Sequence, residues 1–198
     1  MDTPLDRRAE LLRNIVDALL THGAADLSLR PLAERVGTSA RLLIYHFGSK
    51  EQLIADAMAE VRHRIRTSLG ARAVELQPQN LRGLVMMVWD WAVEPGNQSY
   101  FRLLFEVDGL TLFDRVKVSQ ETGREHTAAW IALIERGAER LPTQGALFTA
   151  HSTLILAALT GLLQEFLSTG DTDRTTAALS ALIDLITQDA KGRQGSKS

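Results

Sequence analysis

Apolar residues recur every three or four positions along almost the whole 198-residue chain, and no useful length alternates apolar with polar residues. The first spacing places apolar side chains on one face of a helix, whereas strict alternation is typical of a strand. Glycine, proline and capping residues divide the pattern into separate segments. We therefore expect an all-α protein.

The first fifty residues contain three short helical segments. The first begins at Thr3-Pro4 and ends at His22-Gly23. Ser28 is the candidate cap of a second, short helix, and Gly37 is placed to end it. The third helix follows at once, and two helices joined by a tight glycine turn have the layout of a helix-turn-helix.

The third segment, residues 37–50, has two different faces. Ser39 and Gly48 are suited to begin and end the helix, and Ser49 followed by Gln52 has the spacing of a capping box. At about 100° per residue, one face holds Ala40, Leu43, Ile44 and Phe47, and the other holds Arg41, Leu42, Tyr45 and His46. The first face is predicted to be core. The second carries groups that a two-turn helix does not need in order to fold, which favours a contact with another molecule.

Beyond residue 50, every segment again has helical spacing. The helices are expected at residues 50–69, 81–93, 100–107, 113–141, 143–169 and 175–190. Arg62, His63, Arg64 and Arg66 are expected on a solvated face near a helix end. The predicted organisation is a first domain at 1–50, a connecting helix at 51–69, a second domain at 70–190 and a Gly/Ser-rich disordered tail at 191–198.

The helix expected at 143–169 is apolar on almost every side. Such a helix must be buried on every side, and in a chain this small that favours a second copy of the protein. The alternative is that the last two helices complete the core of one protomer. The residues expected at a symmetric dimer interface are Leu154, Ala158, Gly161, Leu162, Leu179, Leu182, Ile183 and Ile186.

Composition excludes several classes of function. The net charge of −2 does not by itself indicate a nucleic-acid-binding protein, and the absence of cysteine excludes disulfides and thiolate chemistry. No apolar run approaches the roughly 18 residues of a membrane span, and the N-terminus lacks the features of a signal peptide, so we expect a cytoplasmic protein. The chain lacks G-x-S-x-G, H-E-x-x-H, G-x-G-x-x-G and P-loop motifs. We therefore expect no enzyme activity, no metal and no cofactor.

Large aromatic residues concentrate between positions 89 and 166. With neighbouring methionines they are suited to line an adaptable apolar cavity, and ordinary core packing is the alternative. His151 lies within an apolar helix, where it is either a satisfied core histidine or a ligand contact. The candidate pocket residues are Met86, Trp89, Phe101, Phe105, Trp130, Phe148 and His151.

The segment from the first helix to Lys50 resembles the DNA-binding domain of the TetR family of bacterial repressors. The similarity is carried by Gly23, by the runs 27–30 and 32–39, and by Tyr45-His46-Phe47-Gly48-Ser49-Lys50-Glu51-Gln52-Leu53. The resemblance implies a dimer that binds operator DNA and releases it when a small ligand occupies the second domain. It also implies that the last two helices form a four-helix bundle with those of the second copy.

The resemblance also implies roles for individual residues. Ser28 and Arg30 would touch phosphates, and Tyr45, His46 and Lys50 would contact the DNA backbone. Thr38, Ser39, Ala40, Arg41 and Leu42 would lead the third helix into the major groove, where arginine can read guanine and leucine can pack on a thymine methyl. Many relatives have tyrosine where this chain has Ile44, and Ala40 has no base-reading group, so the operator sequence does not follow from these residues.

The resulting hypothesis is a ligand-responsive transcriptional repressor that binds a palindromic operator as a homodimer. Its expected partners are double-stranded operator DNA and a small apolar or amphipathic effector, with no membrane. One alternative is an activator of the same fold. Another is a small-molecule-binding protein or enzyme that uses the helical pocket.

Overall fold

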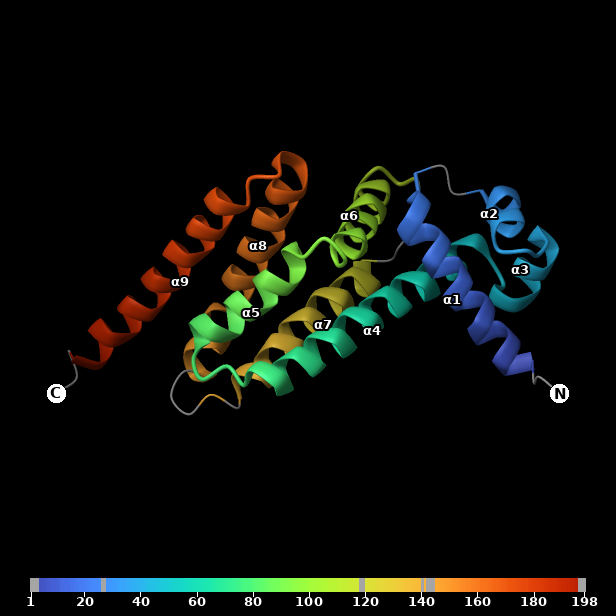
Figure 1. Ribbon diagram of the computed structural model, residues 1–198. Coiled ribbons are helices and arrows are strands. Elements are labelled where there is room, and N and C mark those ends of the chain that lie inside the picture. The colour runs from blue at the N-terminus through green and yellow to red at the C-terminus, as the bar shows by residue number, and fades with distance from the viewer. Residues whose placement is uncertain (1–3, 26–27, 118–119, 140, 142–144, 196–198) are drawn as a thin grey trace. The chain divides into compact units, whose positions relative to one another are not determined.

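The computed structural model describes residues 4–25, 28–117, 120–139, 141 and 145–195, and it places side chains for residues 7–25, 28–117, 124–139, 141 and 149–188. All regular secondary structure of this part of the chain is helical, which confirms the all-α class (Figure 1). The helices are α1 (Pro4–His22), α2 (Leu29–Arg35), α3 (Ala40–Phe47), α4 (Lys50–Leu76), α5 (Leu81–Val93), α6 (Gln98–Leu112), α7 (Gln120–Ala138), α8 (Gly145–Thr169) and α9 (Thr172–Gly195).

Several helix bounds differ from the predicted ones. Helix α4 continues past residue 69 to Leu76, where the left-handed Gln77 (φ 44°) and then Pro78 end it. The helix expected at 113–141 starts at Gln120, because the chain turns after α6 with Asp114 at φ 55°. Helix α9 continues to Gly195, into the segment expected to be a disordered tail, and residues 196–198 lie outside the described part.

The chain divides into two compact units. Unit 1 comprises Met1–Thr67 with Ser99–Gln120, and unit 2 comprises Ser68–Gln98 with Glu121–Ser198. Helix α6 therefore belongs to the unit that contains α1, α2 and α3, although the sequence suggested a second domain spanning residues 70–190. The grouping gives α6 a direct structural role beside the helix-turn-helix.

Unit 1 is built around side chains that are almost completely buried. They come from α1, α3, α4 and α6, and they include Ile15, Val16, Leu43, Leu53, Val61, Ile65 and Leu103. Burial of each such side chain contributes about 1.5–3 kcal/mol. This core fixes the helices on which the candidate DNA contacts lie.

The basic residues near the middle of α4 do not all lie on a solvated face: His63 is exposed as predicted, whereas Arg62 is buried and Arg64 and Arg66 are half-buried. Arg62 is 7% exposed, and burial, opposed by the nearby Asp108 carboxylate, lowers the pKa of its guanidinium to about 10. Burial also raises the pKa of Asp108, with Arg62 opposing that shift. Arg64 donates to Asp17 on α1 at 2.5 Å and to Glu60 one turn back at 3.1 Å. These arginines help to attach α4 to its neighbours in unit 1.

In unit 2, α5 runs antiparallel to α9 along a row of paired side chains. Arg82 forms an ion pair with Asp184 at 2.5 Å, the Ser180 hydroxyl donates to the Met86 sulfur at 3.9 Å, and Trp89 Nε1 donates to Thr176 Oγ1 at 2.8 Å. Residue numbers rise along α5 as they fall along α9. This register turns one face of α5 toward the last helix.

Helices α8 and α9 form a tight antiparallel pair (Figure 1). Gly170, at φ +73°, ends α8, and Asp171 accepts the backbone N–H of Arg174 at the start of α9. The inner stripe of α9 holds Leu179, Ile183 and Ile186, which are at most 5% exposed within a single chain. Three residues predicted at the dimer interface therefore belong to the core of the protomer, because α5 and α8 already cover them.

Helix α8 also corrects the expectation that no apolar run is long enough to span a membrane. Among the described residues, Thr149–Thr169 passes that test by length and composition, with a mean hydropathy of 1.3. Only 28% of this window is buried within the chain. A single helix of this kind also occurs in soluble proteins. Among the described residues of α8, Leu154 is 48% exposed.

Candidate nucleic-acid interface

The turn between α2 and α3 is fixed by backbone hydrogen bonds. Gly37 adopts φ +68°, its N–H donates to Glu34 O, and the N–H of Thr38 donates to Ala33 O at 2.9 Å. These two bonds form a Schellman motif, which requires a left-handed residue at position 37. The motif confirms the predicted tight glycine turn and sets the direction in which α3 begins.

Helix α3 is capped at both ends as predicted. Ser39 Oγ accepts the N–H of Leu42 at 3.2 Å, and the N–H of Gly48, at φ +80°, donates to Ile44 O at 2.8 Å. Ser49 Oγ then accepts the N–H of Gln52 and starts α4. The capping box is only half formed, because the Gln52 side chain donates to Asp56 instead of returning to Ser49.

The eight residues of α3 separate into an inner and an outer face. Leu43 and Phe47 are 0% and 3% exposed, whereas Tyr45, on the opposite side, is 77% exposed. Leu42 is 47% exposed, and Arg41 is also exposed. Thr38, Ala40 and His46 are half-buried at the edges, and Ser39 is exposed.

The prediction that Ile44 faces the core is wrong, since Ile44 is 39% exposed. Leu43 and Phe47 centre the buried face, and Ile44 lies about 80° from that centre on a regular helix. His46 lies equally far away on the other side and packs its ring edge-on against Tyr45 at 5.2 Å. Ile44 therefore adds an apolar group to the outer surface.

Arg8, which the sequence did not single out, connects three helices of unit 1. Its Nε donates to the carbonyl of His46 at 3.1 Å, its Nη2 pairs with Asp56 on α4 at 2.5 Å, and its guanidinium lies 4.9 Å from the centre of the Phe47 ring. The residue thus satisfies a carbonyl at the end of α3 and covers one of the two residues that anchor α3. Nothing in the sequence distinguishes Arg8 from the adjacent Arg7.

The residues predicted to contact phosphates lie at helix starts. Ser28 occupies the N-cap position of α2 but makes no side-chain capping hydrogen bond, and it is exposed. The side chain of Arg30 is 87% exposed. Its Nε lies 3.8 Å from Glu34 Oε1, a long separation that makes a weak ion pair at the surface. Lys50 is the first residue of α4. Helix N-termini favour anions, so these positions suit DNA phosphates.

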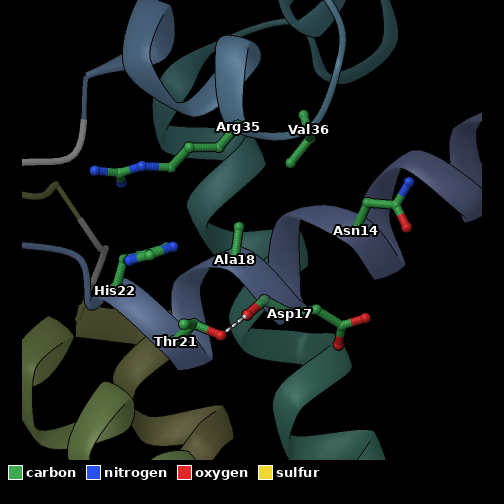
Figure 2. A pocket seen from close by; sticks show the side chains of 7 residues that line it. All are labelled: Asn14, Asp17, Ala18, Thr21, His22, Arg35 and Val36. Carbon is green, nitrogen blue, oxygen red and sulfur yellow. Dashed lines mark hydrogen bonds between the residues drawn. The ribbon is translucent and has the colours of Figure 1, made fainter.

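An open groove of about 440 Å³ lies between α1 and the end of α2 (Figure 2). Arg35 and His22 lie at one end of the groove and Asn14 at the other, and the Thr21 hydroxyl donates to the carbonyl of Asp17. The lining is largely exposed and polar. None of the predicted effector-pocket residues lines this groove, so it is not the apolar cavity that the aromatic residues suggested.

The predicted effector-pocket residues are divided between the two units. Phe101 and Phe105 belong to α6 in unit 1, whereas Trp130 and His151 belong to unit 2, and all four are half-buried. Met86 and Trp89 face α9 through the contacts described above. Trp89 is 1% exposed and packs edge-on against Phe166 at 6.4 Å, so it is a core residue of unit 2. The side chain of Phe148 lies outside the described residues.

Comparison with known proteins agrees with this geometry. Residues 11–57 match the family described as bacterial regulatory proteins of the tetR family. The chain carries a TetR-family N-terminal domain. The matched segment includes α2, α3 and the turn between them, which confirms the resemblance found in the sequence. No curated protein matches the chain in sequence.

Solved structures extend the fold likeness to nearly the whole chain. A protein described as a TetR-family transcriptional regulator from Rhodococcus sp. is 19% identical with a TM-score of 0.70, and the match covers 91% of this chain and 97% of that one. A transcriptional regulator from Rhodococcus sp. Rha1 is 17% identical with a TM-score of 0.67, covering 92% and 96%. A TetR-family regulator from Mesorhizobium loti is 17% identical with a TM-score of 0.59, covering 95% and 96%. At these identities the likeness establishes a TetR-type fold.

The contacts of Arg8 give a prediction for stability. Replacing Arg8 with alanine removes a hydrogen bond to a carbonyl, an ion pair and a contact with Phe47, so we expect the free energy of unfolding to fall by about 1–3 kcal/mol. Among the described residues, the adjacent Arg7 pairs only with the exposed Glu10, and Arg7→Ala should change stability by less than about 0.5 kcal/mol. Urea unfolding followed by circular dichroism measures both. Equal effects of the two substitutions would contradict the role assigned to Arg8.

Proposed function

We propose that the protein is a ligand-responsive transcriptional repressor that binds a palindromic DNA operator as a homodimer. The observation that carries the proposal is the construction of α3, which is anchored by Leu43 and Phe47 and presents Arg41, Leu42 and Tyr45 to solvent. A short capped helix with such an outer face suits the major groove. The TetR-family N-terminal domain supports the same function, which would be exercised in the cytoplasm without enzyme chemistry.

The local distribution of charge supports DNA binding better than the net charge does. Within the described part of the chain, Arg41 and Lys50 form no ion pair, and Arg30 has only the distant Glu34. By contrast, Arg8 and Arg64 form ion pairs with Asp56 and Asp17. Arg41, Lys50 and Arg30 are therefore available to neutralise DNA phosphates.

The proposed dimer uses the outer faces of α8 and α9. On α8 the exposed stripe includes Leu154, Ala157 and Gly161, and on α9 it includes Ala181 and Leu185. Leu154 is 48% exposed and Leu185 is 65% exposed, while the small residues between them allow helices to approach closely. This face keeps Leu154 and Gly161 of the predicted interface and adds Leu185. Ala158, Leu162 and Leu182 are half-buried at its edge.

The effector is proposed to be a small apolar or amphipathic molecule that favours one spacing of the two DNA-binding units over another. Half-sites would lie about 34–36 Å apart, one helical turn of DNA. A ligand changes DNA affinity only as far as it binds the two arrangements differently. The half-buried Trp130 and His151 remain candidates for contacts with the effector.

Selection of duplexes from a random-sequence library by the purified full-length protein tests DNA binding. We expect enrichment of a palindromic site whose affinity falls steeply with salt concentration, because phosphate contacts release counterions. Binding that is equally strong to scrambled duplexes, or absent at low salt, would exclude the proposed function.

Arg41 and Lys50 should differ in the way they affect binding to the selected duplex. Arg41→Ala should relax specificity at one base pair, with a loss of about 1–3 kcal/mol for the preferred base, because arginine reads guanine through two hydrogen bonds. Lys50→Ala should weaken all sequences alike and reduce the salt slope by about one unit. Fluorescence anisotropy with single-base variants of the duplex distinguishes the two effects. The exposed residues Arg136 and Lys117 provide matched controls, whose replacement by alanine should leave both quantities unchanged.

Leu185→Glu tests the proposed dimer. A carboxylate on the outer face of α9 would be buried without a partner, so we expect the mass in solution to fall from about twice 21.8 kDa to 21.8 kDa. Light scattering coupled to size-exclusion chromatography measures this change. Leu76→Glu, at an exposed position near the end of α4, should leave the mass unchanged. A monomeric wild-type protein, or a dimer that survives Leu185→Glu, would refute this interface.

A further inference from the structure

A single carboxylate on α6 binds the backbone immediately after α1. Glu106 Oε2 accepts the N–H of Ala24 at 2.6 Å, and Glu106 Oε1 accepts the N–H of Ala25 at 2.7 Å. Both oxygens of one side chain are therefore used by two consecutive amides that lie about eighty residues away in sequence. Hydrogen bonds to a charged acceptor are shorter and stronger than those between neutral groups.

The backbone at this position is shaped to receive an anion. Gly23 ends α1 by donating to Leu19 O, and its φ of +76° turns the chain so that the next N–H groups leave the helix. Consecutive amides next to a left-handed residue form a concavity that binds negative charge. A Cβ at position 23 would lie 2.8 Å from Glu106 Oε2, so the carboxylate would have to shift from its present position if residue 23 carried a side chain.

One of the two amides and the helix that carries Glu106 are buried, whereas Ala25 is exposed. Ala24 is 4% exposed. Glu106 lies on α6 between Leu103 and Val107, which are 2% and 4% exposed and fix that helix in the core of unit 1. The turn bound by Glu106 leads within three residues to Ser28, the N-cap position of α2. Glu106 thus holds the backbone three residues before Ser28, where a phosphate contact is proposed.

We propose that Glu106 is a positioning residue for DNA binding, whose carboxylate orders the turn at residues 23–25 and through it the start of α2. This inference rests on the proposed DNA-binding function. Helix α5 belongs to unit 2, and residues 94–97 connect it to α6. Helix α6 is therefore the helix with which the chain returns from unit 2 to unit 1. A displacement of α6 would act on α2 through these two hydrogen bonds, with no change required in α3.

Glu106→Gln and Glu106→Ala in the full-length protein test the proposal. Glutamine has nearly the same shape, but it is uncharged, and its NH₂ group replaces one of the two acceptor oxygens and cannot accept the N–H that faces it. We expect amide hydrogen exchange to accelerate at Ala24 and Ala25. We expect affinity for the duplex selected by the wild-type protein to fall about tenfold, the effect of losing one charge-assisted hydrogen bond from the bound arrangement.

A stability control separates positioning from simple support of the fold. Asp171, in unit 2, is also a carboxylate that accepts a backbone N–H, that of Arg174. Asp171→Asn should lower the thermal midpoint without changing DNA affinity measured well below that midpoint. Unchanged exchange at Ala24 and Ala25 in the Glu106 variants would overturn the contact. Accelerated exchange with unchanged DNA affinity would overturn the positioning role. If the wild-type protein selects no duplex, the DNA-binding function fails, and the exchange measurement still tests the contact.

Gly23→Ala provides a second, independent test. In the wild-type background, Gly23→Ala has two costs: the added Cβ crowds the Glu106 carboxylate, and alanine is strained at a positive φ. In the Glu106→Ala background, the backbone cost remains but the contact with the carboxylate is gone. The loss of thermal midpoint caused by Gly23→Ala should therefore be smaller in the second background, and equal losses would contradict the proposed seating of Glu106.

Discussion

The attachment of α3 by Leu43 and Phe47 is the constraint on which the recognition surface depends. An eight-residue helix is not stable alone in water, so it must be held by burial, caps and neighbours. Leu43 and Phe47 supply the burial, Ser39 and Gly48 close the two ends, and Arg8 covers Phe47 while binding the last turn. Because these few residues are enough to hold the helix, the side chains on the opposite face are not needed for folding.

The sequence predicted the local features of this region well and the long-range ones poorly. Caps, glycine turns and the 3.6-residue period act within a few positions, so Ser39, Gly37 and Phe47 were all interpreted correctly. Arg8 and Glu106 act across 38 and more than 80 residues, and each binds backbone groups that carry no residue-specific signal. A side chain that binds backbone groups has no partner residue of a particular type, so the sequence contains no residue spacing that would reveal the contact.

Helical-wheel reasoning was also limited where a helix has more apolar positions than its neighbours can cover. Ile44 is apolar but lies outside the narrow buried face of α3. Trp89, expected at a cavity, is buried on α5, where it contacts Phe166 of α8 and donates a hydrogen bond to Thr176 of α9. The pattern identifies which residues can be buried. Which of them are buried depends on the partner helix, and the antiparallel register of α5 and α9 was not evident from either segment alone.

The same argument explains why α8 is apolar on nearly every side. One side packs on α5 and α9 within the protomer, where Ile155 is fully buried, and another side leaves Leu154 exposed. The apolar composition of α8 therefore comes from two different faces of the helix, one buried in the protomer and one exposed. The small residues Ala157 and Gly161 on the exposed stripe would let α8 approach a second copy of the chain closely, as the proposed dimer requires. The composition that resembles a membrane span thus follows from an internal core on one side and the proposed dimer on the other.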